Sequence, residues 1–145
     1  MAVLTPPPNA MATSSGYTWM DADGCIIAVG SDHQLHTLEH AIENTELIGR
    51  LKGSVRRPFL IDMTRVKSMS KEAREYYAGP EPKKNITAVA ILTTSSVGKA
   101  VANFFLLLTS PSVPTRMFTD FAEAKAWLLK YKDGPEALID NEHLV

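Results

Sequence analysis

Two short apolar runs, each followed by the signals of a helix, constrain the fold of this chain most. Residues 58–63 (Pro-Phe-Leu-Ile-Asp-Met) and 86–93 (Ile-Thr-Ala-Val-Ala-Ile-Leu-Thr) have the length and composition of buried strands. After the first run, Ser70 can cap a helix that ends at Gly79-Pro80. Short strands that alternate with helices predict a largely parallel sheet with right-handed crossovers.

The remaining elements follow from similar patterns. Two runs of strand-forming residues flank Asp23-Gly24, which supplies the positive φ that a hairpin turn needs. Asp120 and Glu123 form a capping box at the start of the last helix. We therefore predict strands over 17–20, 25–29, 58–63, 86–93 and 115–118, and helices over about 34–51, 70–78, 95–108 and 121–131. This order, β-β-α-β-α-β-α-β-α, predicts an α/β fold in a single domain with an N-terminal β-hairpin.

We expect three segments along the 145 residues, a length that suits one domain. Residues 1–15 contain three consecutive prolines and no periodicity, which predicts a disordered leader. Residues 16–132 form the domain. The tail, 133–145, holds either one more short helix or no regular structure.

Several absences point to the compartment. Cys25 is the only cysteine, so no internal disulfide can form, which fits a reducing environment. The N-terminus lacks the basic flank and apolar run of a signal peptide. No segment approaches the roughly 18 apolar residues of a membrane helix. We therefore expect a cytoplasmic protein that does not insert into a membrane.

The net charge of −1 conceals a basic segment. Residues 51–85 hold nine basic and four acidic residues, whereas residues 1–50 hold one basic and six acidic residues. Such a segment either meets an acidic partner surface or forms a solvated face. Because the basic residues are interleaved with helix and strand patterns, we favour the solvated face. We expect no nucleic-acid partner.

The stretch 59–73, Phe-Leu-Ile-Asp-Met-Thr-Arg-Val-Lys-Ser-Met-Ser-Lys-Glu-Ala, resembles the STAS domains of anti-sigma-factor antagonists. That family has an apolar strand, an Asp, a Ser or Thr two residues later, a Val, and then an Asp-Ser-Ser/Thr-Gly phosphorylation loop that opens a helix. The residues that match the first part are Asp62, Thr64, Val66 and Met69. The residues that depart from the loop are Ser70 in place of Asp, Lys71 and Glu72 in place of the phosphate acceptors, and Ala73 in place of Gly.

The resemblance covers about residues 17–131 and implies a STAS-like fold with a regulatory, protein-binding role. In this register the loop is no longer a phosphorylation switch and Ser70 serves only as a helix cap. If the alignment with the family is instead shifted by one or two residues, Ser68 or Ser70 becomes the phosphate acceptor. The stretch 104–128 is similar to divergent bacterial proteins, related to both STAS and lipid-carrier domains, that share the fold without its switch.

A zinc-protease pattern occurs once. His36, Glu39 and His40 form H-x-x-E-H, whose spacing puts both imidazoles on one helical face, as a metal requires. The apolar side of the same predicted helix consists of Leu35, Leu38, Ala41, Ile42, Thr45 and Ile48. Because the histidines lie opposite this side, together with Glu43, we expect them to face solvent and predict no metal site.

The helix predicted over 95–108 carries two further candidates. Ser95, Ser96 and Lys99 lie at its start, and two interpretations apply to them. Either they bind an anion, or Ser95 or Ser96 serves only as the N-cap of the helix; we favour the N-cap. Within it, an apolar run either fills the core or forms an interface or a ligand-lining wall. The residues of this run that we single out are Phe105, Leu106 and Leu107.

No set of residues in the sequence forms a convincing catalytic constellation, and we interpret Cys25 as a buried structural thiol. We therefore expect no enzyme activity and no cofactor. The primary hypothesis is a non-catalytic, STAS-like regulatory domain that lacks the phospho-acceptor, forms a homodimer and binds an unidentified protein partner. The alternative hypothesis is a protein that binds a small hydrophobic, lipid-type ligand.

Overall fold

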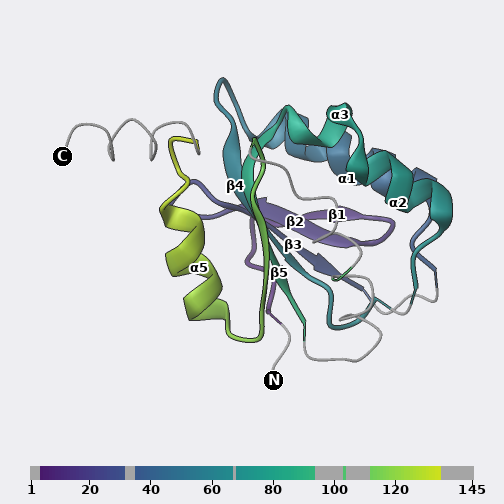
Figure 1. The fold of residues 1–145 in the computed structure, drawn as a ribbon. Coiled ribbons are helices and arrows are strands. Elements are labelled where there is room, and N and C mark those ends of the chain that lie inside the picture. The colour runs from purple at the N-terminus through teal and green to yellow at the C-terminus, as the bar shows by residue number, and fades with distance from the viewer. Residues whose placement is uncertain (1–3, 32–34, 67, 94–102, 104–111, 135–145) are drawn as a thin grey trace.

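The strands of the sheet lie side by side in the order in which they occur in the chain (Figure 1). The computed structural model describes residues 4–31, 35–66, 68–93, 103 and 112–134. Over these ranges the strands are β1 (Met11–Thr13), β2 (Gly16–Met20), β3 (Ile26–Gly30), β4 (Arg57–Asp62), β5 (Ile86–Leu92) and β6 (Thr115–Phe118). The pairs β1–β2 and β2–β3 are antiparallel, and every later pair is parallel.

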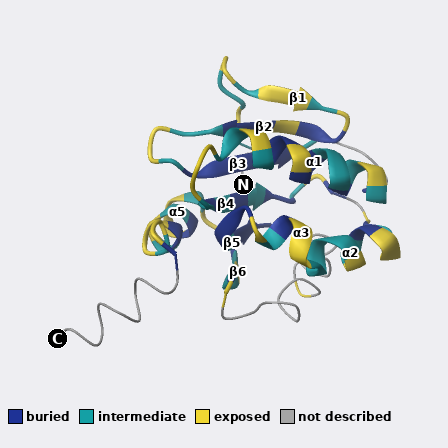
Figure 2. Cartoon of the chain, turned by 90° about the horizontal axis from the view of Figure 1, so that it is seen from above, coloured by how far each residue is buried: buried dark blue, intermediate teal, exposed yellow. Residues whose placement is uncertain are grey.

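Helices cover both faces of this sheet (Figure 2). The helices of the described ranges are α1 (Leu38–Leu51), α2 (Lys71–Ala78), α3 (Pro80–Lys83) and α5 (Phe121–Leu129). The connection from β3 to β4 runs through α1, and the connection from β4 to β5 runs through α2 and α3. Successive right-handed crossovers in one direction along a sheet place their helices on the same face, so α1, α2 and α3 lie together. The last helix, α5, packs on the other face against β4 and β5.

Two apolar layers result, and the strand sequences show why. Along β4, side chains alternate between the faces, with Leu60 in the cluster under α5 and Ile61 in the cluster under α1 and α2. Along β5, Ala88 and Ala90 face α5, while Ile91 faces α1 and α2. Since both faces of these strands are covered, they read as continuous apolar runs rather than alternating ones.

The predicted hairpin followed by strand-helix alternation is confirmed over the described ranges. The helix expected over 95–108 lies outside them, except for Asn103. At the hairpin turn, Asp21 Oδ1 accepts hydrogen bonds from the backbone N–H groups of Asp23 (2.9 Å) and Cys25 (3.0 Å). Lys125 of α5 forms ion pairs with both Asp21 and Asp23, so this turn is tied to the helix that covers it.

The prediction of a disordered leader over residues 1–15 is wrong for residues 4–15. Met11–Thr13 form β1, and Leu4 and Ala10 pack against the cluster under α5. Ser14 donates hydrogen bonds to Glu43 Oε1 of α1 from its hydroxyl (2.6 Å) and its backbone N–H (3.0 Å). These bonds hold the pKa of the Glu43 carboxyl below its usual value. A strand of three residues is too short to produce a readable sequence pattern.

The prediction that the first helix begins near residue 34 is also wrong. Thr37 is its N-cap, with a reciprocal capping box to His40, and α1 begins at Leu38. His36 instead forms an isolated parallel bridge with Met69. The prediction that Leu35 belongs to the buried apolar side of this helix is therefore wrong, since Leu35 is 45% exposed. The prediction is confirmed at Ala41, Thr45 and Ile48, which are buried, whereas Ile42 is half-buried and Asn44 and Leu47 are buried without having been predicted.

Two glycines give a matched test of this fold. Gly16 has φ +153°, and a Cβ there would lie 2.0 Å from Val29 O, so we expect Gly16→Ala to cost at least ~2 kcal/mol. A Cβ at Gly49 in α1 would meet only ordinary contacts, the nearest being Asn85 Nδ2 at 3.7 Å, so Gly49→Ala should stabilise by about 0.5–1 kcal/mol. Urea unfolding of both variants measures this; equal effects would contradict the β2–β3 register.

Candidate functional site

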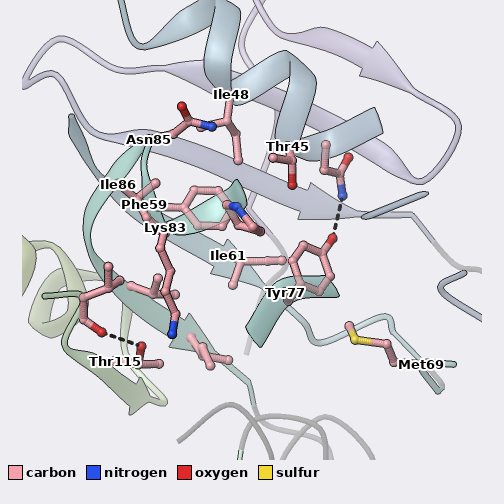
Figure 3. Close-up of a pocket in the computed structure, with 15 residues that line it drawn as sticks. Thr45, Ile48, Phe59, Ile61, Met69, Tyr77, Lys83, Asn85, Ile86 and Thr115 are labelled. Carbon is pink, nitrogen blue, oxygen red and sulfur yellow. Dashed lines mark hydrogen bonds between the residues drawn. The ribbon is translucent and has the colours of Figure 1, made fainter. Parts of the chain in front are cut away.

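A pocket opens between the sheet and the helices α1, α2 and α3 (Figure 3). Its volume is about 90 Å³. The apolar residues that line it are Ile48, Phe59, Ile61, Met69, Pro82, Ile86, Val89, Ile91 and Val113. The polar residues that line it are Asn44, Thr45, Tyr77, Lys83, Asn85 and Thr115. An apolar cavity with a few polar groups on its wall is typical of a site for a small organic molecule.

The pocket follows from the unequal helices on this face. The helix α1 runs for 14 residues, whereas α2 runs for 8 and buries only Ala73 completely. Gly79 adopts an extended conformation that ends α2, and α3 then begins with Pro80. Within the described ranges, the short α2–α3 pair leaves Ile61 and Val89 of the strands beneath it only partly buried, and both line the pocket.

A chain of hydrogen bonds forms the polar wall. The Tyr77 hydroxyl lies 2.8 Å from His36 Nε2 and accepts a bond from Asn44 Nδ2 at 3.4 Å. Asn44 Oδ1 in turn accepts a bond from the Ser15 hydroxyl at 3.3 Å. Burial raises the pKa of Tyr77 well above its usual value, so its hydroxyl stays protonated. These side chains join α2, α1, the β1–β2 turn and the segment before α1.

Lys83 carries the formal charge of this site. It is the one charged residue among the described residues that line the pocket, and it is half-buried. Figure 3 shows its side chain extending along the pocket toward the side formed by Thr115. No carboxylate of the described ranges pairs with its ammonium group. Its neighbour Lys84 is not among the described lining residues and pairs with Glu81 at 2.7 Å, with both side chains exposed.

A second, smaller pocket adjoins the first. Its volume is about 20 Å³, and Asn44, Ile61 and Met69 line both cavities. His36 and the buried carboxylate of Asp62 also line this second pocket. A volume of this size holds about one water molecule, and the surrounding side chains offer it several hydrogen-bonding partners.

The loop that resembles a phosphorylation switch is held by local hydrogen bonds. Asp62 is 1% exposed, and its Oδ1 accepts bonds from the Thr64 backbone N–H (2.9 Å) and hydroxyl (2.7 Å). Ser70 Oγ accepts a bond from the Ala73 backbone N–H at 3.1 Å, so its predicted role as the N-cap of α2 is confirmed. Lys71 and Glu72 are exposed in the first turn of α2.

The zinc-protease pattern does not assemble a metal site in the structure. The expectation that both histidines face solvent is wrong for His36, which is buried against Tyr77 because residue 36 precedes the helix. His40 Nδ1 accepts a hydrogen bond from the Thr37 backbone N–H at 3.0 Å as part of the capping box. Within the described ranges, no group of three or more His, Cys, Asp or Glu side chains lies together.

Part of the basic segment is structural. Arg56 donates from Nε and Nη2 to Ile86 O (3.0 and 2.8 Å), and Nη2 also donates to Ser112 O (2.8 Å). Arg57 Nε donates to Lys52 O at 2.9 Å. The predicted solvated face therefore does not include these two arginines.

The candidates on the helix expected over 95–108 lie outside the described residues: Ser95, Ser96, Lys99, Phe105, Leu106 and Leu107. Sequence reasoning missed Asn44, Tyr77 and Lys83 as residues of one site. One signal was available for Asn44, a polar residue one turn from Ala41 and Ile48 on the buried side of a helix. The position of Tyr77 and Lys83 depends on how α2 and α3 pack, which the sequence pattern does not contain.

Residues 18–132 match the model of a protein family described as a domain of unknown function, DUF7793. The chain belongs to this family. No curated protein matches it. Within the described part of the DUF7793 chain, no helix is both long and apolar enough to cross a membrane.

A solved structure shows the fold of this DUF7793 protein. An uncharacterised protein of the DUF3478 family from Shewanella loihica PV-4, with a SpoIIAA-like fold, is 20% identical with a TM-score of 0.52. The match covers 83% of this chain and 90% of the Shewanella protein, so the predicted STAS-like, or SpoIIAA-like, fold is confirmed. A protein of unknown function from Arthrobacter sp. FB24 is 26% identical with a TM-score of 0.32, over 81% and 95% of the two chains.

Cys25 is completely buried beside the hairpin turn. Burial, followed by the nearby Asp21 carboxylate, raises the pKa of its thiol to about 11. Since the thiolate is the reactive form, we expect the native protein at pH 8 to react with a disulfide reagent at least ~100-fold more slowly than the urea-unfolded protein. Absorbance of the released thiolate gives both rates, and equal rates would contradict a buried structural role.

Proposed function

We propose that this domain acts by binding rather than by catalysis, and that the pocket under α1, α2 and α3 holds a small, mainly apolar ligand. The observation that carries the proposal is the pocket itself, whose described wall is mostly aliphatic and aromatic side chains. Burial of apolar surface in such a cavity supplies the free energy of binding, and the few polar groups orient the ligand.

The chemistry of the buried reactive groups supports a non-catalytic role. The pKa of the Cys25 thiol is raised to about 11, so little thiolate exists near neutral pH. The raised pKa of Tyr77 makes its hydroxyl a hydrogen-bonding group and not a base. His36 is engaged by Tyr77, and His40 by the backbone of Thr37.

A series of straight-chain alcohols from 1-butanol to 1-octanol tests the ligand proposal. Each buried CH₂ contributes about 0.8 kcal/mol, so we expect the Kd to fall about fourfold per carbon and then level off once the pocket is full. Isothermal titration calorimetry of the full chain measures these constants.

A matched pair of variants locates the binding. Val89→Phe fills the pocket and should abolish binding, whereas Val55→Phe adds the same group at a residue that is 52% exposed and should leave binding unchanged. Thermal melting confirms that each variant is folded. Alcohols that fail to bind the wild-type chain saturably, or that bind Val89→Phe equally well, would contradict the proposal.

A second candidate function is a STAS-like protein-binding domain without phosphate control. The observation that favours it is the use of Ser70 as the cap of α2, followed by the non-acceptors Lys71 and Glu72. In the resembled family a phosphate at this helix start changes the charge that a partner meets. Here Glu72 supplies a permanent negative charge in the first turn, where the helix dipole stabilises it. The homodimer and the protein partner stay predictions.

Ser70→Ala separates a cap from a switch. We expect it to lower the free energy of unfolding by about 1 kcal/mol, because Ala73 N–H loses its partner, and to leave ligand or partner binding unchanged. Ser54→Ala, at an exposed loop residue, is the control and should change stability by less than ~0.5 kcal/mol. Intact-mass spectrometry of the native protein completes the test, since stoichiometric phosphate on Ser68 or Ser70 would restore the switch and overturn this prediction.

A further inference from the structure

We infer that the ligand of the pocket is an anion: a carboxylate with a short apolar chain, whose charged end pairs with Lys83. This inference rests on the proposed ligand-binding function and names the chemical class of the ligand. Three observations carry it, namely a positive charge on the wall that has no ion pair within the described ranges, the lack of acidic side chains among the described lining residues, and the size of the cavity.

The state of Lys83 differs from that of the lysine beside it. Lys84 is exposed and has Glu81 as its partner at 2.7 Å, which raises its pKa. Lys83 is half-buried on the pocket wall and has no ion pair with any residue of the described ranges. An ammonium group beside apolar side chains has lost part of its hydration, and a bound anion replaces that loss with a charge-assisted hydrogen bond.

The rest of the wall favours an anion over a cation or a dipolar ligand. The other polar residues that line the pocket are neutral, among them Thr115 and Asn85 near the strand ends. Asp62 is the acidic residue among the described residues that line the adjoining cavity, and its Oδ1 is bonded to Thr64. An anion beside Lys83 therefore meets no opposing carboxylate within the described lining.

The volume limits the apolar part of the ligand. A cavity of about 90 Å³ is smaller than the roughly 150 Å³ cavity that encloses benzene in an engineered protein. We therefore expect the enclosed part of the ligand to have about four carbon atoms, with the aliphatic chain against Ile61 and Val89 and the carboxylate at Lys83. A much longer chain would have to leave the pocket.

Three ligands of equal chain length test the charge. We expect hexanoate to bind the full chain at least tenfold more tightly than 1-hexanol at pH 7.5, and hexylamine to bind more weakly than 1-hexanol, as measured by titration calorimetry. Lys83→Met should remove the preference for hexanoate and leave the Kd of 1-hexanol within about twofold. Lys84→Met is the matched control and should keep the preference, since that side chain is exposed, pairs with Glu81 and is not among the described lining residues.

The outcomes distinguish the two proposals. If 1-hexanol binds but hexanoate binds no more tightly, or if Lys83→Met keeps the preference, the pocket binds apolar ligands and the inference about charge is overturned. If none of the three ligands binds, both the proposed function and the inference fail. The comparison of ligands on the wild-type chain needs no variant, so a loss of stability in Lys83→Met, detected by thermal melting, does not affect it.

Discussion

The handedness of the β-α-β connection is the constraint on which the rest of this structure depends. Strands that are added in one direction, each through a right-handed crossover, require their helices to share one face of the sheet. The helix α1 and the pair α2–α3 are therefore neighbours, whatever their relative lengths (Figure 2). Because α2–α3 is the shorter layer, the described residues do not fully cover the apolar face of β4 and β5 there. The pocket is thus a consequence of topology combined with a short helix, rather than of any single residue.

The polar wall shows how the chain stabilises such an arrangement. A tyrosine from α2 and an asparagine from α1 meet under the helices, and the hydroxyl of Tyr77 joins Asn44 to His36. Buried polar groups are costly without partners, so this cluster fixes how the two helices lie relative to each other. Ser15 extends the cluster to the β1–β2 turn, which explains why the N-terminal residues up to that turn are part of the fold.

The sequence predicted the elements whose patterns are local, and failed where contacts across the chain decide. The hairpin at Asp23-Gly24 and the cap at Ser70 could be read because turn and cap chemistry lies within a few residues. The start of α1 was placed too early because a capping box at Thr37 and a bridge from His36 to Met69 compete with the helix. The pocket could not be found in this way, since its residues come from six separate elements and the loops between them. For the same reason His36 was interpreted as half of a solvated metal pattern, although its ring is buried against a residue 41 positions away.

The switch-like loop and the pocket are parts of one structural unit. Met69, next to the cap residue Ser70, lines the pocket, and Tyr77 at the other end of α2 lines it as well. The wall of the cavity therefore includes a residue just before, and a residue near the end of, the helix that in the resembled family follows the phosphorylated residue. A ligand can shift the position of a helix only if it makes different contacts with two positions of that helix. The contacts with Met69 and Tyr77 are the ones that would differ if α2 moved. If the pocket holds the ligand proposed above, that ligand would act on the helix whose exposed surface carries Lys71 and Glu72, without a phosphate at the loop.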